Sequence, residues 1–287
     1  MVAALEPAIS APAAAAPAGA LDAETAAPRV EAWTEASPEV LSDLRAGRPL
    51  VTVLQVPLCS NRQIRCGGQG AGDPASLDKN LYWGRGFGVR RYFDETARGW
   101  RLIARSEPGG TTLEQRVYAR DFDGSSFGLP SGHTVRHLVV MRAVNGDAIE
   151  SAVDSFYELA TRGGRVRFEE DGQARDERVH VAGYAGHNRL MDGYRLKEAA
   201  VDSASSLPSF VIACRSSQYF SSALAAHGST TLVMTRDLVA PEGYVIEALA
   251  NALGRNSSPR EIRAQVVRAY ARWQKLSENV ASTIFAR

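Results

Sequence analysis

Two short apolar runs constrain the fold of this 287-residue chain more than any other feature. They are Val179–Ala185 and Phe210–Ala213, and each ends where glycine or polar residues begin. Continuous short runs of this kind are typical of parallel strands that are buried on both faces. Similar runs at Leu50–Leu58, His137–Val144 and Thr230–Thr235 predict further strands of the same sheet.

Segments with helical periodicity separate these runs. Gly146–Thr161 has an apolar stripe and Asp147 as its expected cap. Amphipathic patterns also predict helices over Leu81–Glu95, Pro241–Leu253 and Ser258–Lys275. Strands that alternate with helices predict a three-layer α/β/α domain with a mostly parallel central sheet.

The N-terminal residues differ from the rest of the chain in composition. Residues 1–27 are mostly Ala and Pro, and no Lys or Arg precedes Arg29. The segment lacks the basic start and the continuous apolar core of a secretory signal. Its composition predicts a disordered arm over residues 1–35. A single α/β domain is expected over residues 36–287. We expect a cytoplasmic protein by default, while an exported form stays open because such an arm would also remain after removal of an upstream targeting segment.

Composition and charge exclude several classes of function. Hydrophobic residues make up 45% and charged residues 23% of the chain, as in ordinary soluble domains. No window is apolar enough for an integral membrane segment. The net charge is +1 and no basic stripe accompanies the aromatic residues, so no nucleic-acid partner is expected. His133 and His137 have the spacing of helical zinc ligands, but the companion Glu is missing, so no metal site is expected. The oligomeric state stays open.

The chain contains three cysteines, Cys59, Cys66 and Cys214, and an odd number cannot all pair with one another. Cys59 and Cys66 could form a disulfide across a small loop if the protein is exported, or remain two free thiols in the cytosol. Both lie in the glycine-rich segment Cys59–Asn80, which follows the first predicted strand. Functional loops leave the carboxyl ends of parallel strands, so this segment is a candidate part of a site.

Each of the two organising runs is followed by a residue that can do chemistry. Gly186 and His187 follow the first run, and Cys214 follows the second. If the two strands are neighbours, the imidazole and the thiol emerge at the same edge of the sheet. Such a pair predicts a Cys214 nucleophile with His187 as its base, an oxyanion held by backbone amides near Cys214 and Gly186, and a thiolate stabilised by the first amides of the following helix. The alternative is a buried structural thiol, because Cys is among the most buried residue types.

The same blocks carry a resemblance to a known family. An apolar block that ends in Gly-His, followed by one that ends in Ala-Cys (FVIACRS, Phe210–Ser216), resembles the caspase-like (clan CD) cysteine peptidases. The GHNRLMD and ACRSSQYF blocks also resemble a bacterial group of such proteins that has no established activity. The resemblance implies a caspase-like fold and a His187/Cys214 dyad that hydrolyses bonds in a peptide or protein substrate, without a metal or organic cofactor.

Several positions depart from that family. Asn188 stands where the family usually has Gly, and Ser216 stands where caspases have Gly. Ile212 occupies the position at which metacaspases carry an Asp that binds basic side chains. These departures support a second hypothesis, in which the chain is a catalytically inactive interaction or sensor module on the same fold. The candidate substrate-binding or oxyanion residues are Gly186, Asn188, Arg215 and Asp192.

Overall fold

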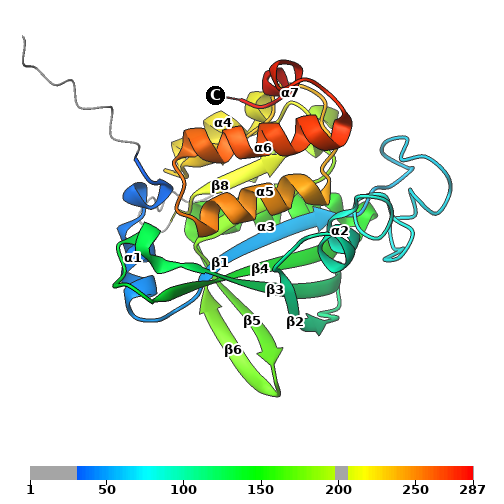
Figure 1. Ribbon diagram of the computed structural model, residues 1–287. Helices are drawn as coiled ribbons and strands as arrows, with labels where there is room; N and C mark the ends of the chain where they lie inside the picture. Colours follow the sequence, from blue (N-terminus) through cyan, green and yellow to red (C-terminus); the bar gives the residue numbers. More distant parts are fainter. Residues whose placement is uncertain (1–30, 198–205, 287) are drawn as a thin grey trace, which may run out of the picture. The chain divides into compact units, whose positions relative to one another are not determined.

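The computed structural model describes residues 31–197 and 206–286. Its central element is a seven-stranded sheet with the strand order β2-β3-β4-β1-β7-β8-β9 (Figure 1). The neighbours from β4 to β9 pair in parallel, and β2 and β3 are antiparallel at one edge. The strands are β1 (Leu50–Pro57), β2 (Arg101–Ser106), β3 (Thr112–Asp123), β4 (Thr134–Val144), β7 (Val181–Ala185), β8 (Ser209–Ile212) and β9 (Thr231–Val233). The mostly parallel sheet expected from the sequence is thereby confirmed.

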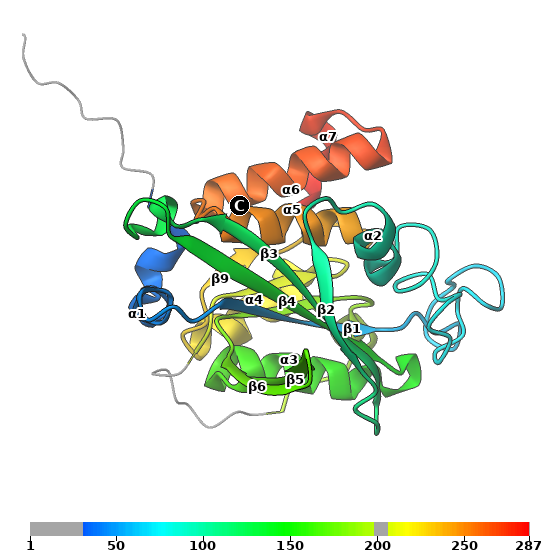
Figure 2. The same ribbon diagram turned by 60° about the horizontal axis from the view of Figure 1, so that its bottom comes forward.

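Helices cover both faces of this sheet (Figures 1 and 2). One face is covered by α3 (Ile149–Arg162) and α4 (Ser216–Ala226). The opposite face is covered by α2 (Val89–Glu95), α5 (Gly243–Gly254) and α6 (Pro259–Gln274). The shorter helices are η1 (Trp33–Ala36), α1 (Pro38–Arg45), η2 (Gly124–Phe127), η3 (Gly146–Ala148), η4 (Arg189–Asp192) and α7 (Glu278–Ile284). The predicted three-layer α/β/α architecture is confirmed.

The central strand shows why an apolar run was required. All eight residues of β1 are buried. Leu54 lies in the part of the core that α5 and α6 cover, whereas Val51 and Val53 pack on the opposite face of the sheet. A strand between two covered faces needs apolar side chains at consecutive positions, and LVTVLQVP provides them.

A hairpin completes the α3 face of the sheet. It consists of β5 (Arg165–Glu170) and β6 (Gln173–Arg178), which form a separate two-stranded sheet. Val166 and Phe168 of β5 are buried against the valines of β1 and β3. The alternating burial of β5 places Arg165, Arg167 and Glu169 toward solvent, whereas Glu170 is buried and paired with Arg136. A segment rich in arginine and glutamate thus still contributes to the core.

Two helix predictions differ from the structure. The helix expected over Leu81–Glu95 begins only at Val89, because the preceding glycines pack against backbone. A Cβ atom on Gly84 would lie 2.1 Å from the Leu77 carbonyl oxygen, which forces a compact turn there. Asp147 was expected to cap the helix after β4, but the Asn145 side chain accepts the Asp147 amide and holds this terminus.

The folded unit begins before the boundary expected from the sequence. Trp33 is 2% exposed, and its indole Nε1 donates to the Leu253 carbonyl at 3.0 Å. Residues 31–35, which composition placed in the arm, therefore include part of the core. The remainder of the predicted arm, residues 1–30, lies outside the described residues.

Candidate functional site

The strands that carry the two predicted reactive residues are neighbours. β7 and β8 pair in parallel with Ala185 opposite Ile212. His187 and Cys214 each lie two residues beyond this pair, so they leave the carboxyl edge of the sheet at matching positions. The expectation that the two runs are adjacent strands is therefore confirmed, and the roles of His187 and Cys214 remain predictions.

His187 is held by a carboxylate. Its Nε2 lies 2.7 Å from Asp192 Oδ2, and its backbone carbonyl accepts a hydrogen bond from the Tyr184 hydroxyl, also at 2.7 Å. Because a carboxylate only accepts, Nε2 carries the proton of a neutral ring and Nδ1 is left with its lone pair. Asp192 was expected to line a substrate or oxyanion site. The structure places it against the histidine ring, where it fixes the ring's orientation.

An arginine links this pair to the rest of the domain. The Arg189 guanidinium lies 3.3 Å from Asp192 Oδ2 and 3.0 Å from Glu150 Oε1 on α3. Both Arg189 and Asp192 lie on η4, the short helical turn that directly follows the histidine. The turn therefore presents the carboxylate to the ring and is itself tied to α3.

Asn188 joins the histidine loop to the cysteine loop. It is fully buried; its side-chain nitrogen donates to the Cys214 carbonyl at 2.6 Å, and its side-chain oxygen accepts from the Leu190 amide at 3.1 Å. A glycine at this position could make neither bond. The departure from the family pattern at Asn188 thus has a structural consequence, which is a fixed connection between the two strand ends.

Cys214 is a partly exposed free thiol. Its sulfur lies 3.8 Å from the Val239 carbonyl oxygen, which accepts the thiol hydrogen bond. In the described part of the chain the thiol and the His187 ring share no hydrogen bond, since the ring is bonded to Asp192 and the thiol to Val239.

The first amides of α4 are not available to the thiol, contrary to the sequence-based expectation. The Ser216 amide donates to the Thr235 hydroxyl at 3.2 Å, and the Ser217 amide donates to the Thr235 carbonyl at 2.9 Å. Thr235 is fully buried and follows β9, so the neighbouring strand end satisfies the helix. The expected stabilisation of a thiolate by direct hydrogen bonds from this helix is therefore wrong.

At two of the four candidate oxyanion or substrate residues, the backbone amide already donates to a carbonyl of the protein. The Gly186 amide donates to the Ile212 carbonyl at 3.2 Å, and the Arg215 amide donates to the Asp237 carbonyl at 3.0 Å. Gly186 is therefore not an oxyanion donor, and its lack of a side chain instead avoids Pro57, 2.8 Å from a built Cβ. Across residues 31–197 and 206–286, the amides of Asn188 and Cys214 have no acceptor. Asn188 is fully buried, so the amide of the partly exposed Cys214 is the one that a ligand can reach.

A pocket of about 320 Å³ has Val239, the residue bonded to the Cys214 thiol, in its lining. Its lining includes Tyr82, Leu238, Val239, Pro241, Glu242 and Tyr270. The Val239 carbonyl is the acceptor of the Cys214 thiol, which connects the pocket to the sulfur. Burial raises the pKa of Tyr82, and the nearby Cys214 raises it further; both effects also raise the pKa of Tyr270.

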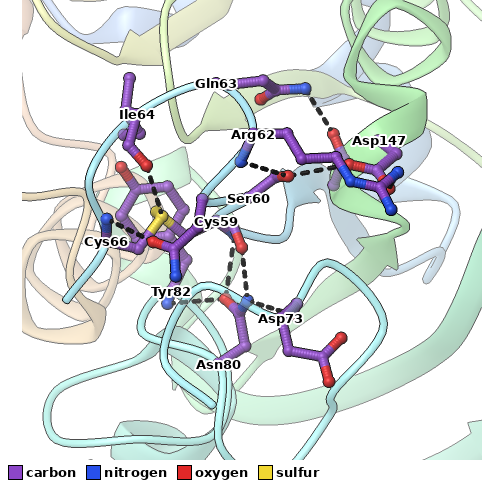
Figure 3. Close-up of a disulfide and its surroundings, with 12 residues drawn as sticks. Cys59, Ser60, Arg62, Gln63, Ile64, Cys66, Asp73, Asn80, Tyr82 and Asp147 are labelled. Carbon is purple, nitrogen blue, oxygen red and sulfur yellow. Dashed lines mark hydrogen bonds and ion pairs between the residues drawn. A yellow bond between two sulfur atoms is a disulfide. The ribbon is translucent and has the colours of Figure 1, made fainter. Parts of the chain in front are cut away.

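A disulfide holds one side of this pocket in place (Figure 3). Cys59 and Cys66 are bonded, as the sequence suggested for an exported protein. Asn80 is fully buried; its oxygen accepts from the Cys59 and Tyr82 amides, both at 3.0 Å, and its nitrogen donates to the carbonyls of Cys59 and Asp73. Figure 3 shows this amide between the start and the end of the loop. The loop therefore delivers Tyr82 to the pocket in a fixed position.

The same loop is anchored to α3 as well. Asp147 accepts from the Ser60 hydroxyl at 2.8 Å and from Arg62 at 2.7 Å (Figure 3). Asp147, expected only as a helix cap, thus joins the helix terminus to the disulfide loop. No sequence pattern indicates this contact, or the presence of Tyr82, Val239 and Tyr270 at the pocket, because these residues meet only in the folded chain.

In comparisons with protein-family models, curated proteins and solved structures, nothing matches this chain. Within the described residues, no group of three or more His, Cys, Asp or Glu side chains could hold a metal ion. No helix among those residues is both long and apolar enough to cross a membrane. Function is therefore inferred from the geometry at the ends of β7 and β8.

Proposed function

We propose that the protein is a cysteine endopeptidase of caspase-like type, in which His187 and Cys214 hydrolyse peptide bonds. The observation that carries the proposal is the matching exit of these two residues from neighbouring parallel strands, with Asp192 2.7 Å from the histidine ring. A nucleophile, a base beside it and a third group that orients the base are the parts that covalent catalysis requires. The substrate is a peptide or protein.

The reaction begins with transfer of the Cys214 proton to His187 Nδ1. The resulting thiolate attacks the substrate carbonyl carbon, and the amide of Cys214 donates to the oxyanion. The imidazolium then gives its proton to the leaving amine, and water hydrolyses the thioester to release the acid and restore the thiol. Substrate binding has to replace the bond from the thiol to the Val239 carbonyl, since that bond turns the S–H away from the ring.

Two measurements test this assignment. The rate at which iodoacetamide alkylates Cys214, followed by peptide mass mapping, is expected to fall at neutral pH in His187→Ala. A peptide library is expected to be cleaved by the wild type and left intact by Cys214→Ala. Equal alkylation of Cys214 in the wild type and in His187→Ala, together with an uncleaved library, would show that the pair is not a dyad.

A second candidate is a catalytically inactive interaction or sensor module on the same fold. The specific observation in its favour is that the thiol donates to a carbonyl while the first α4 amides are occupied by Thr235. For this module, Cys214→Ala is expected to bind the same peptide or protein partner as the wild type with unchanged affinity. Turnover of any peptide by the wild type alone decides for the peptidase.

We also propose that the protein works in an oxidising compartment, as an exported protein. The Cys59–Cys66 disulfide supports this over the cytoplasmic default, because disulfides persist mainly outside the cytosol. Non-reducing peptide mapping of the protein from its native cells is expected to recover the linked peptide. Recovery of both thiols in the free form would contradict the proposal.

A further inference from the structure

We infer that the pocket beside Cys214 binds a basic side chain of the substrate, lysine or arginine, at the residue whose carbonyl is attacked. This inference rests on the proposed peptidase function. It takes its support from the chemistry of the pocket wall and from the connection of that wall to the thiol. The specificity group is Glu242, which lies three residues beyond the thiol-bonded Val239 on the same lining segment.

The pocket wall suits the stem of a long side chain. Tyr82 and Tyr270 contribute aromatic surface, and Leu238 and Pro241 contribute aliphatic surface. Lysine and arginine bury their methylene stems against apolar surface and keep the charged head near polar groups. Aromatic faces add an attraction for the cation itself. A short acidic side chain would gain little from such a wall.

The charge of the pocket selects the head group. Among its lining residues, which all belong to the described part of the chain, Glu242 is the one with a formal charge. Its Oε2 accepts from the Tyr244 hydroxyl and from Gln274 at 2.9 Å, while Oε1 has no donor within residues 31–197 and 206–286. A carboxylate held through one oxygen, with the other free, is suited to accept a hydrogen bond from an ammonium or guanidinium group.

The position of the carboxylate is fixed by an aromatic platform. Gln274 also donates to the Tyr244 hydroxyl at 2.7 Å, so the three side chains form a closed set. The Tyr244 ring stacks on Trp273 at a centroid distance of 5.8 Å, and Tyr244 is 1% exposed. Glu242 thus keeps one geometry in the empty pocket, and a substrate cation does not have to order it.

This route to basic specificity uses a different segment from the one in metacaspases. Their acidic position corresponds to Ile212, which is fully buried in β8 and cannot reach a substrate. Glu242 instead belongs to the segment between β9 and α5. The two arrangements make different predictions for mutagenesis, because only Glu242 should affect the choice of substrate charge.

The experiment compares fluorogenic peptides that differ only at the residue before the cleaved bond. Arginine and lysine peptides are expected to give kcat/KM values on the order of 10- to 100-fold above those of citrulline and norleucine, which keep the shape but lose the charge. Glu242→Gln is expected to remove most of that ratio by lowering kcat/KM for the arginine and lysine peptides. Glu247→Gln is the matched control, because Glu247 bonds to Tyr92 outside this pocket and should keep the ratio.

The outcomes separate the two proposals. Cleavage of citrulline or aspartate peptides as fast as arginine peptides, or an arginine preference that survives Glu242→Gln, overturns the basic pocket and leaves the peptidase standing. An acyloxymethyl ketone probe with lysine at the same position gives a readout without turnover, through the mass of its Cys214 adduct. If no peptide is cleaved and no such probe labels Cys214 faster than iodoacetamide does, both proposals fail together.

Discussion

Two histidine–carboxylate pairs lie at opposite ends of the same strand. They differ in how far their side chains are exposed, and therefore in whether a ligand can reach them. His180 precedes β7 and lies 3.1 Å from Asp43, whereas His187 follows β7 and lies 2.7 Å from Asp192. The side chains of the first pair are 2% and 5% exposed, and those of the second are 10% and 33% exposed. The same chemical pair is thus closed at one end of the strand and open at the other.

The pair at the amino end has no capacity left for a ligand. His180 Nδ1 accepts the Val51 amide at 3.1 Å, so its Nε2 carries the proton that is shared with Asp43. Burial lowers the pKa of His180, and the bond to Asp43 opposes this in part. At the carboxyl end, by contrast, His187 Nδ1 has no partner in the described ranges. A free, basic ring nitrogen at a sheet edge is the property that the His180 pair lacks.

The largest expected effect is on catalysis at the open pair. His187→Ala should lower kcat/KM on a cleaved peptide by roughly 10²–10⁴-fold, because it removes the proposed general base. The free energy of unfolding should fall by about 1–2 kcal/mol, less than for the closed pair, since the ring is 10% exposed and its carboxylate partner is 33% exposed. Peptide kinetics and urea denaturation of the same preparation measure both quantities. A stability loss as large as the catalytic loss would show that this pair, too, is structural.

The closed pair should behave in the opposite way. His180→Ala leaves the Val51 amide and the Asp43 carboxylate without their buried partner, and it should lower the free energy of unfolding by about 2–4 kcal/mol. Where the variant remains folded, kcat should stay within a few-fold of the wild type. Urea denaturation, with kinetics at a temperature below the transition, measures both. A loss of turnover in fully folded His180→Ala would contradict the contrast between the two pairs.

The third expectation concerns the pH dependence of stability. It includes His137, another buried histidine, which lies on β4 opposite Leu50 of β1. Complete burial lowers the pKa of His137 from 6.5 to about 3, and burial also lowers the pKa of His180. Both rings stay neutral in the folded chain while the unfolded chain binds protons below pH 6.5, so stability is present above pH 6.5 and is lost as pH falls toward 3. The slope should reach about 1.4 kcal/mol per pH unit for each histidine.

Urea denaturation at several pH values between 7.5 and 4.5 measures this slope. His137→Gln should flatten it at some cost in stability, because glutamine has no proton to gain and Thr52 then loses its bond to the ring. A slope that is the same in wild type and His137→Gln would show that other groups control acid stability.

The comparison also shows how much of the molecule could be predicted from its sequence. The apolar runs identified β7 and β8, because buried parallel strands need consecutive apolar residues. Their adjacency was an assumption at that point, and the pairing of Ala185 with Ile212 supplies it. His187 and Cys214 followed from their place directly after those runs. The carboxylate partner of His187 could not be predicted in this way, since Asp192 reaches the ring only through the turn of η4.

Long-range contacts account for the remaining errors. Thr235 closes the first turn of α4, and Tyr270 reaches the pocket, through packing between segments that no local pattern connects. The helix expected over Leu81–Glu95 began late because Gly84 and Gly88 lie against backbone, which periodicity cannot show. Local sequence thus predicted elements and strand ends, and tertiary contacts decided which donors and acceptors at those ends remained free.

The smallest expected effect distinguishes orientation from catalysis at the open pair. Asp192→Asn keeps an acceptor for His187 Nε2 but removes the charge that stabilises the protonated ring, so kcat should fall by about 10-fold with KM unchanged. Asp192→Glu should restore part of the loss, and Arg189→Gln controls for the ion pair that Asp192 also makes. Because Asp192 is one-third exposed, the free energy of unfolding should change little, whereas Asp43→Asn should lower it. If Asp192→Asn lowers stability and leaves kcat intact, Asp192 is a structural partner like Asp43, and the positioning role proposed for it is wrong.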